Sequence, residues 1–535
     1  MSAPETPNSG EIRAQTAKRR TFAIISHPDA GKTTLTEKLL LYSGMIRTAG
    51  MVRGRKGGKT AVSDWMGMEQ ERGISITASA MQFHYKDSVI NVLDTPGHQD
   101  FSEDTYRTLT AADSAIMVID AAKGVETQTR KLFAVCALRG IPVLTFMNKM
   151  DLPARDPLDL MHEVEQVLGI KAAAMDWPVG SGRDFTGVVD RATKELVAFE
   201  KTSVGGADRA AMKRLPLDGE EARALLGADT RERLGHELEL LEEAGNPFSR
   251  EEFLAGRVTP VYFASALTNF GVENFYDAFV DLAPPPGARL ADLPDGGETL
   301  VDPVDNPFSA YVFKLQANMN PRHRDSTAFF RVCSGRFERD LVVKHHRLGK
   351  EVRLSRPHSM VASDRHTLDE AFPGDIVGVI NPGTFAIGDT ISLAGGFDFK
   401  PLPSFQPEVF GSIRPKDVGK RKQFDKGLTQ MTAEGTVQLM RSWNGLDLFI
   451  AAVGRLQFDV LQYRLKGEYG VETVLETLPY TCSAWVQGEM ESFDAPVPVL
   501  KLKDGKDRAV VLFKSAWDKE YTQRKCQGYT FLDMA

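Results

Sequence analysis

The segment 26–33 (SHPDAGKT) is the feature that most restricts how this chain can fold. It follows the apolar run 22–25, which predicts a buried strand, and it precedes Leu35, Leu39 and Tyr42, whose spacing predicts a helix. A loop of this kind between a strand and a helix, ending in Gly-Lys-Thr, is typical of a loop that binds phosphate groups through its backbone N–H groups. We therefore expect an α/β domain of the P-loop type around it.

The residue types in this loop also predict its chemistry. Lys32 would reach the β and γ phosphates of a nucleotide, and the hydroxyl of Thr33 would ligate Mg²⁺. The common pattern begins with glycine where this chain has Ser26, a small residue that still permits the tight turn.

A second motif, Asp94-Thr95-Pro96-Gly97-His98, follows the apolar run 89–93. Asp94 would hold the cation, directly or through water, and the N–H of Gly97 would meet the γ-phosphate, since glycine permits close backbone approach. His98 comes directly afterwards and is the candidate catalytic residue that positions the attacking water. The sequence leaves open whether it acts as a base or as an oriented hydrogen-bonding group.

A third motif, Asn148-Lys149-Met150-Asp151, follows the apolar run 143–147 and predicts selection of the base. The Asp151 carboxylate can accept both the N1–H and the exocyclic N2–H of guanine, whereas adenine offers no matching pair of donors. Asn148 would brace the loop and the stem of Lys149 would cover the base. In a fourth and weaker element, 264–267, backbone groups near Ser265 would contact the guanine oxygen.

The segment 63–77 lies where a first switch segment belongs. A hydroxyl there would complete the Mg²⁺ shell only while the γ-phosphate is present; Ser75 is the first choice and Thr77 the alternative. The glycine-rich, basic run 54–59 precedes it.

The predicted cofactors are thus GTP or GDP and Mg²⁺. The predicted metal ligands are Thr33, Ser75 and Asp94. The predicted GTP-binding residues are Ser26, His27, Pro28, Asp29, Ala30, Gly31, Lys32, Thr33, Thr34, Asp94, Thr95, Pro96, Gly97, His98, Asn148, Lys149, Met150, Asp151, Ser265, Ala266 and Leu267.

The order of strand and helix patterns predicts three folded units. Apolar runs alternate with helical patterns up to about residue 285, which favours a doubly wound α/β domain. We expect this G domain at 1–285, with an insertion at about 152–260 that contains helices near 230–243 and 251–255. A linker at 286–305, a β-barrel domain at 306–396 and an α+β domain at 397–535 follow.

Hydropathy, cysteine spacing and net charge limit the class of protein to which this chain can belong. No window of ~18 apolar residues occurs, and the polar N-terminus lacks a signal-peptide core, so we expect a cytoplasmic protein without a membrane partner. Four widely spaced cysteines predict reduced, buried thiols. The net charge of −7 argues against a general nucleic-acid coat. Two basic clusters remain open as contacts to RNA phosphates, one at 53–59 and one at 416–426.

These motifs, with His98 closing Asp-Thr-Pro-Gly-His, resemble those of the translational GTPases. Longer phrases at 63–66, 71–77, 101–109, 145–149 and 456–460 resemble the peptide chain release factor 3 family. The resemblance implies a G domain, a β-barrel and a C-terminal α+β domain in a monomeric, ribosome-dependent GTPase of translation termination. With GTP it would promote departure of the stop-codon-reading release factors after peptide release.

For particular residues, the resemblance implies that ribosomal RNA activates His98, while Pro28 and Ile74 flank its access to the γ-phosphate. Ser75 stands where elongation factors commonly have threonine.

Three alternatives carry sequence arguments against them. An elongation factor G-like translocase or ribosomal-protection GTPase has extra C-terminal domains, for which 397–535 leaves no room. A nucleotide-gated binding module would not need His98. An ATP-dependent enzyme of small molecules would not need Asp151.

Overall fold

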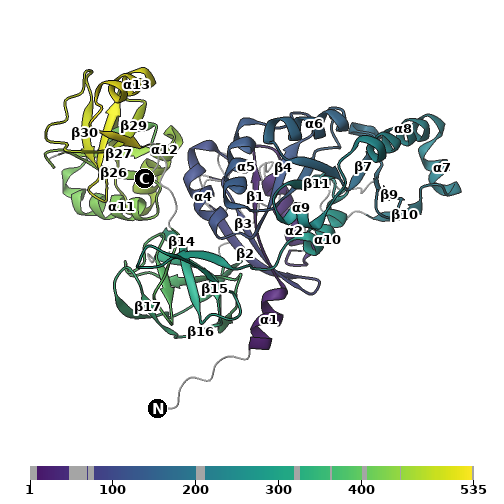
Figure 1. The fold of residues 1–535 in the computed structure, drawn as a ribbon, viewed down its shortest axis with the longest axis horizontal. Helices are drawn as coiled ribbons and strands as arrows, with labels where there is room; N and C mark the ends of the chain where they lie inside the picture. The colour runs from purple at the N-terminus through teal and green to yellow at the C-terminus, as the bar shows by residue number, and fades with distance from the viewer. Residues whose placement is uncertain are drawn as a thin grey trace, which may run out of the picture.

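The computed structural model describes residues 9–46, 69, 78–200, 211–317, 326–361, 364–400, 406–445 and 447–532. Three bodies follow one another along the chain (Figure 1): a mixed sheet flanked by helices, an antiparallel barrel, and an α+β unit. This is the order of fold classes expected from the sequence. Among the described residues, no helix has the length and apolar character that crossing a bilayer requires.

The first sheet has seven strands in the order β2-β3-β1-β4-β5-β11-β6, and every pair is parallel except β2 with β3. The strands are β1 (Arg19–Ser26), β2 (Ser79–Tyr85), β3 (Ser88–Asp94), β4 (Ser114–Asp120), β5 (Val143–Asn148), β6 (Lys171–Ala174) and β11 (Val258–Phe263). The strands predicted from the apolar runs 22–25, 89–93 and 143–147 are therefore confirmed as β1, β3 and β5, and β3, β4, β5 and β11 are buried along their whole length. Burial on both faces is what a parallel core sheet requires.

Helices cover both faces of this sheet. They are α2 (Lys32–Tyr42), α4 (Ser102–Thr110), α5 (Thr127–Arg139), α6 (Pro157–Leu168), α9 (Arg250–Leu254) and α10 (Val272–Leu282), with α1 (Ser9–Ala17) at the described N-terminus. Side chains of α4, α5 and α6 join one apolar cluster, and those of α2, α9 and α10 join the other. Along β1, Ala23 and Ile25 face the first cluster while Phe22 and Ile24 face the second, as the alternation of a strand dictates.

The segment interpreted as an insertion contains the two predicted helices, as α8 (Ala228–Ala244) and α9. It also holds an antiparallel sheet of β7 (Asp176–Val179), β8 (Gly187–Asp190), β9 (Glu195–Phe199) and β10 (Met212–Pro216), followed by α7 (Glu220–Leu226); a short 3-10 turn, η2 (Gly182–Asp184), precedes β8. It further supplies α6 and β6 to the first sheet. The sequence did not predict β6 because Lys-Ala-Ala-Ala has no strand preference of its own; pairing with β11 imposes the conformation.

The stretch interpreted as a linker contains a β-hairpin. Its strands β12 (Arg289–Asp292) and β13 (Glu298–Val301) pair with each other, and β12 pairs with β24 (Asp398–Phe399) from beyond the barrel. The hairpin thus joins the two ends of the barrel segment. The domain boundaries at residues 285, 305 and 396 remain predictions.

The barrel is entirely antiparallel. Its strands, in spatial order, are β18 (Lys350–Arg353), β17 (Val342–His345), β23 (Thr390–Ser392), β14 (Ser309–Ala317), β15 (Ser326–Ser334), β22 (Ile376–Ile380), β19 (His358–Val361) and β20 (Asp364–Thr367), with the small pair β16 (Phe337–Glu338) and β21 (Glu370–Ala371) beside them. Phe308, Phe330 and Phe385 lie in its apolar core. Curling the sheet around this core protects its edges.

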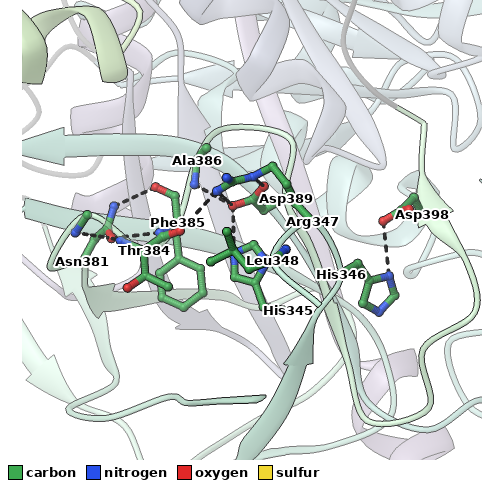
Figure 2. A network of polar contacts seen from close by, with 11 residues as sticks. His345, His346, Arg347, Leu348, Asn381, Thr384, Phe385, Ala386, Asp389 and Asp398 are labelled. Atoms are coloured by element: carbon green, nitrogen blue, oxygen red, sulfur yellow. Dashed lines mark hydrogen bonds and ion pairs between the residues drawn. The ribbon is translucent and has the colours of Figure 1, made fainter. Parts of the chain in front are cut away.

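A polar network fastens the loop before β23 to the barrel (Figure 2). The buried Asp389 carboxylate accepts Arg347 Nε at 2.6 Å and Nη2 at 2.9 Å, and also the backbone N–H of Ala386 at 2.7 Å. His345 lies beneath it, stacked on Phe385 at 5.5 Å, and burial lowers the pKa of His345. The histidine is therefore neutral at physiological pH, and the network has a structural role.

The last unit packs α11 (Arg421–Ala433) and α12 (Arg455–Tyr469) against an antiparallel sheet, with α13 (Ala516–Lys525) further along and the 3-10 turn η3 (Val418–Lys420) before α11. The strands, in spatial order, are β28 (Thr473–Thr477), β25 (Val409–Pro415), β27 (Leu448–Ala452), β26 (Gln438–Ser442), β30 (Leu500–Lys503), β31 (Ala509–Phe513), β29 (Cys482–Gln487) and β32 (Thr530–Leu532). Helices and an antiparallel sheet together make this unit the α+β domain expected from the sequence.

Buried polar contacts fix the barrel on the first domain. The Asp375 carboxylate of the barrel accepts Arg19 Nε at 2.8 Å, Gln82 Nε2 at 2.8 Å and Asn91 Nδ2 at 3.2 Å. In the opposite direction, the fully buried Arg331 donates to Asp113 Oδ2 at 2.6 Å. Such pairs are costly to break, because the remaining charge is left buried alone.

The expectation of four buried thiols is only half right. Cys136 and Cys333 are buried and free, whereas Cys482 and Cys526 are free but half-buried. In the basic cluster at 416–426, Lys416 pairs with Glu472 and Arg421 with Asp425, so part of its charge is already neutralised.

Candidate nucleotide site

The phosphate loop runs from the end of β1 at Ser26 to the start of α2 at Lys32. Two residues in it have positive φ, Asp29 at 63° and Gly31 at 103°. Only glycine adopts the second value readily, and the same position has no room for a side chain: a Cβ on Gly31 would lie 2.1 Å from Asn148 Nδ2. The loop therefore requires Gly31 both for its conformation and for the close approach of Asn148.

The side chains of the loop differ in their surroundings. His27 points to Glu126, with Nε2 3.3 Å from a carboxylate oxygen. The Ser26 hydroxyl is buried and finds no hydrogen-bond partner within the described structure. Thr33 and Thr34 are half-buried in the first turn of α2. Because the first N–H groups of a helix have no partner within the helix, this turn presents donors suited to phosphate.

Lys32 and Asp94 form a buried ion pair at the centre of the site, with Nζ 2.5 Å from Oδ1. The pair joins the start of α2 to the end of β3. Thr95 next to it donates to the carbonyl of Ile24 at 2.6 Å, which fixes the second motif on β1. A Cβ on Gly97 would lie 3.7 Å from Pro28 Cα, so this glycine reaches the phosphate loop itself.

Asn148 connects the phosphate loop to the base side of the site. Its Nδ2 donates to the carbonyl of Ala30 at 2.8 Å, and its Oδ1 accepts the N–H of Ala266 at 2.9 Å. The side chain is 2% exposed. One buried amide thus fixes the relative positions of two loops that lie far apart in sequence.

The other residues of the base side are fixed in the same way. Ser265 Oγ donates to Asp151 Oδ1 at 2.6 Å, which orients the carboxylate expected to accept guanine. Lys149, in the left-handed region at φ 69°, donates from Nζ to Asp120 Oδ2 at 2.8 Å. Met150 is buried, whereas Leu267 is 53% exposed. Strained backbone of this kind is typical of functional sites.

His98 lies on the other side of the second motif, just before the short turn η1 (Gln99–Phe101). Its Nδ1 is 3.3 Å from Asp100 Oδ1, and its ring meets Phe101 edge-on at 6.4 Å between centroids. The side chain is about one-third exposed, so the imidazole is accessible while one of its nitrogens is occupied.

The structure brings together the phosphate loop, Asp94, Gly97, Asn148 and the loop at Ser265. Ser75, Thr77 and Ile74 lie outside the described residues, as do the whole segments 54–59 and 63–68. In the fourth element the Ser265 hydroxyl donates to Asp151, and the contact of its backbone with the guanine oxygen stays a prediction.

Sequence reasoning missed two acidic residues beside the site. Asp120 ends β4, next to β5 in the sheet, and a carboxylate directly after a buried strand is the signal that could have identified it. Asp100 stands two residues beyond His98, but nothing in the sequence indicates its partner on α12.

Comparison with known proteins agrees with the geometry. Residues 17–285 match the elongation factor Tu GTP binding domain, 307–394 match elongation factor G domain 2, and 399–523 match the class II release factor RF3, C-terminal domain. A crystal structure of a Thermus thermophilus protein resembles the chain with a TM-score of 0.69 over 91% of this chain and 72% of the other, at 22% identity, which supports the fold. Fold and site together define a GTPase of the translation-factor class.

Curated relatives narrow this class. Peptide chain release factor 3 of Gloeobacter violaceus is 52% identical over 98% of this chain and 99% of the relative, and that of Symbiobacterium thermophilum is 51% identical over 97% and 98%. The chain belongs to the peptide chain release factor 3 family. It is a GTP-binding and GTP-hydrolysing protein of translation termination, and the elongation-type alternative is not favoured.

Proposed function

We propose that this protein, in its GTP-bound state, binds the terminating ribosome and promotes dissociation of the stop-codon-reading release factors after the peptide has been freed. The observation that carries the proposal is the match of residues 399–523 to the release-factor C-terminal domain, on a chain that its relatives match almost end to end. The protein would act as a cytoplasmic monomer that contacts ribosomal RNA and ribosomal proteins.

In this proposal the triphosphate lies against the loop from Ser26 to Thr34. Lys32 exchanges its contact with Asp94 for the β and γ phosphates, and the N–H of Gly97 meets the γ-phosphate. Two observations support the placement: the orphaned buried hydroxyl of Ser26, and the packing of Gly97 on Pro28.

The guanine base is read by Asp151, whose carboxylate Ser265 orients. Asn148 fixes the distance between the phosphate loop and the loop at Ala266. The stem of Lys149 covers the base, while Asp120 anchors the Lys149 ammonium group. The backbone of Ala266 and Leu267 completes the edge of this pocket.

The residues around Asp94 also fit Mg²⁺. The buried Asp94 carboxylate already faces a cation, the Lys32 ammonium, and the neighbouring Thr33 offers a hydroxyl oxygen, so the donor set consists of the hard oxygens that Mg²⁺ prefers. A hydroxyl from Ser75 or Thr77 would complete the set. When bound, the ion neutralises charge on the β and γ phosphate oxygens.

Hydrolysis in this scheme depends on His98 orienting the attacking water, and the ribosome stimulates it by ordering the site. The decisive test measures dissociation of the stop-codon-reading factor from terminated ribosomes. We expect faster dissociation with this protein and GTP than with GDP; equal rates would refute the release-factor role while leaving the GTPase intact.

His98→Ala tests the catalytic part. We expect ribosome-stimulated hydrolysis to fall by about 10²-fold or more, the usual contribution of a positioned general base, with the Kd for GTP nearly unchanged. Unchanged stimulated hydrolysis in this variant would show that His98 is not the catalytic residue.

A further inference from the structure

Asp100 holds His98 at one ring nitrogen. His98 Nδ1 accepts the backbone N–H of Asp100 at 3.3 Å, and the same atom lies 3.3 Å from Asp100 Oδ1. Once Nδ1 carries the proton, this accepted bond is replaced by a charge-assisted bond to the ionised carboxylate, and Nε2 is left unprotonated. A base whose ring is oriented by a third group is a recurring arrangement in catalysis.

Asp100 is itself held by the C-terminal domain. Its Oδ2 accepts the backbone N–H of Leu456 at 2.7 Å, a contact between residues 356 positions apart. Leu456 is the second residue of α12, so the carboxylate lies where an N-cap side chain normally accepts.

The helix has no cap of its own for this N–H. The residue before α12 is Gly454, which has no side chain, and the Gln457 amide oxygen accepts the N–H groups of Val453 and Gly454 instead. Asp100 therefore caps α12 from another domain, and the positive end of the helix favours its charge.

The contact is shielded from water. Asp100 is 8% exposed, and Phe101 packs with Val460 and Leu456 of α12 directly beside it. Burial by itself raises the pKa of Asp100, but the hydrogen bonds from His98 and from Leu456 N–H outweigh it, and the pKa lies below its ordinary value. The carboxylate is therefore ionised when it meets the imidazole.

We infer that Asp100 is a positioning residue for GTP hydrolysis: it sets the tautomer and orientation of His98, and helix α12 of the C-terminal domain sets Asp100. Movement of the C-terminal domain then changes the hydrolysis rate without touching the nucleotide. This inference rests on the proposed role of His98. It adds the contacts through which the position of the C-terminal domain affects the orientation of His98 in the active site.

Asp100→Asn separates a positioning role from a structural one. The Asn oxygen can still accept Leu456 N–H, but its amide then offers a donor to Nδ1 and favours the opposite tautomer. We expect Asp100→Asn and Asp100→Ala to lower ribosome-stimulated kcat about 10- to 100-fold, part of the 10²–10⁴-fold that a positioned base contributes. The Kd for GTP should change by less than about twofold, since Asp100 is not among the nucleotide-binding residues. If Asp100→Asn restores the parental rate while Asp100→Ala does not, the role is structural and the inference is wrong.

Nitrogen NMR of the histidine rings provides a signature that stability does not affect. In the full-length protein we expect His98 to carry its proton on Nδ1, and in Asp100→Asn on Nε2, with His98→Gln identifying the signal. The same tautomer in both proteins would overturn the proposal even if both fold.

Two glycine substitutions test the part played by α12. A Cβ on Gly454 would lie 2.0 to 2.3 Å from the Asp100 carboxylate atoms, and because the backbone there is extended (φ −146°) Gly454→Ala introduces no strain of its own. Gly467→Ala, on the same helix, places its methyl group in open space. We expect about a tenfold loss of stimulated kcat for Gly454→Ala, since misplacing a catalytic group by an ångström costs up to ~10²-fold, and none for Gly467→Ala.

The outcomes separate this inference from the proposed function. If His98→Ala abolishes stimulated hydrolysis while the Asp100 and Gly454 variants keep the parental rate, the coupling is wrong and the catalytic role of His98 stands. If His98→Ala itself keeps the parental rate, the catalytic assignment fails, and the coupling fails with it.

Discussion

Replacing Asn148 with alanine tests whether one buried amide holds the nucleotide site together. The substitution removes the donor to the Ala30 carbonyl at 2.8 Å and the acceptor for Ala266 N–H at 2.9 Å. Both backbone groups would then be left unpaired in a region where the side chain is 2% exposed. An orphaned buried group costs about 1–3 kcal/mol, so the folded site loses about 2–6 kcal/mol.

Part of this loss of stability reduces the free energy of nucleotide binding, because binding requires both loops in their folded positions. If reordering the loops takes about 2 kcal/mol from the binding free energy, the Kd for GDP rises about 30-fold, at 1.4 kcal/mol per factor of ten. Titration with a fluorescent GDP analogue measures this change, and circular dichroism verifies that the variant folds.

Asn306→Ala is a matched control. Asn306 also accepts a single backbone N–H, that of Asp302 at 2.7 Å, but it lies in the segment before the barrel. We expect a lower unfolding temperature and an unchanged Kd for GDP. A folded Asn148→Ala protein with a Kd within about twofold of the parent would refute the claim that this amide couples the two loops.

Three further predictions concern the base, the interface and pH. Asp151→Ala should weaken GTP binding and narrow the preference for GTP over ATP; isothermal titration with both nucleotides checks this, and a preserved preference would show that another group reads the base. Arg331→Met should cost about 3–5 kcal/mol of stability, because it leaves Asp113 buried without its closest partner. The double variant Asp113→Asn/Arg331→Met should recover much of the loss in thermal unfolding, and no recovery would mean that the pair is not the cause. Burial first, and Asp190 in addition, raise the pKa of Asp176 well above its ordinary value, against the hydrogen bond from Phe263 N–H. The folded state thus holds the proton more tightly than the unfolded chain, so stability falls as pH rises through the range above the ordinary value. Asp176→Asn should therefore raise the unfolding temperature at about pH 8 and have little effect near pH ~4, around the ordinary pKa of a carboxyl group; the reverse order would contradict the burial argument.

The amino-acid sequence by itself determined the phosphate loop, the strands that carry it and the order of the three folded units. These features depend on local physics. Gly31 is required by a positive φ, apolar runs such as 89–93 are strands because both faces of a parallel sheet are buried, and Asp151 follows the end of such a strand. The motif at 148–151 was readable because its residues are neighbours in the chain.

Only the tertiary structure decided which distant groups meet. Nothing local shows that Asp100 caps a helix 356 residues away, that Asn148 bridges Ala30 and Ala266, or that Asp113 faces Arg331. Strand β6 is a further case, since its alanines adopt the extended conformation through pairing with β11. The physical reason is the same in each case. The chemistry of a carboxylate or an amide determines which groups it can hydrogen-bond. The packing of whole domains determines which of these partners is buried beside it, and therefore which bond must form.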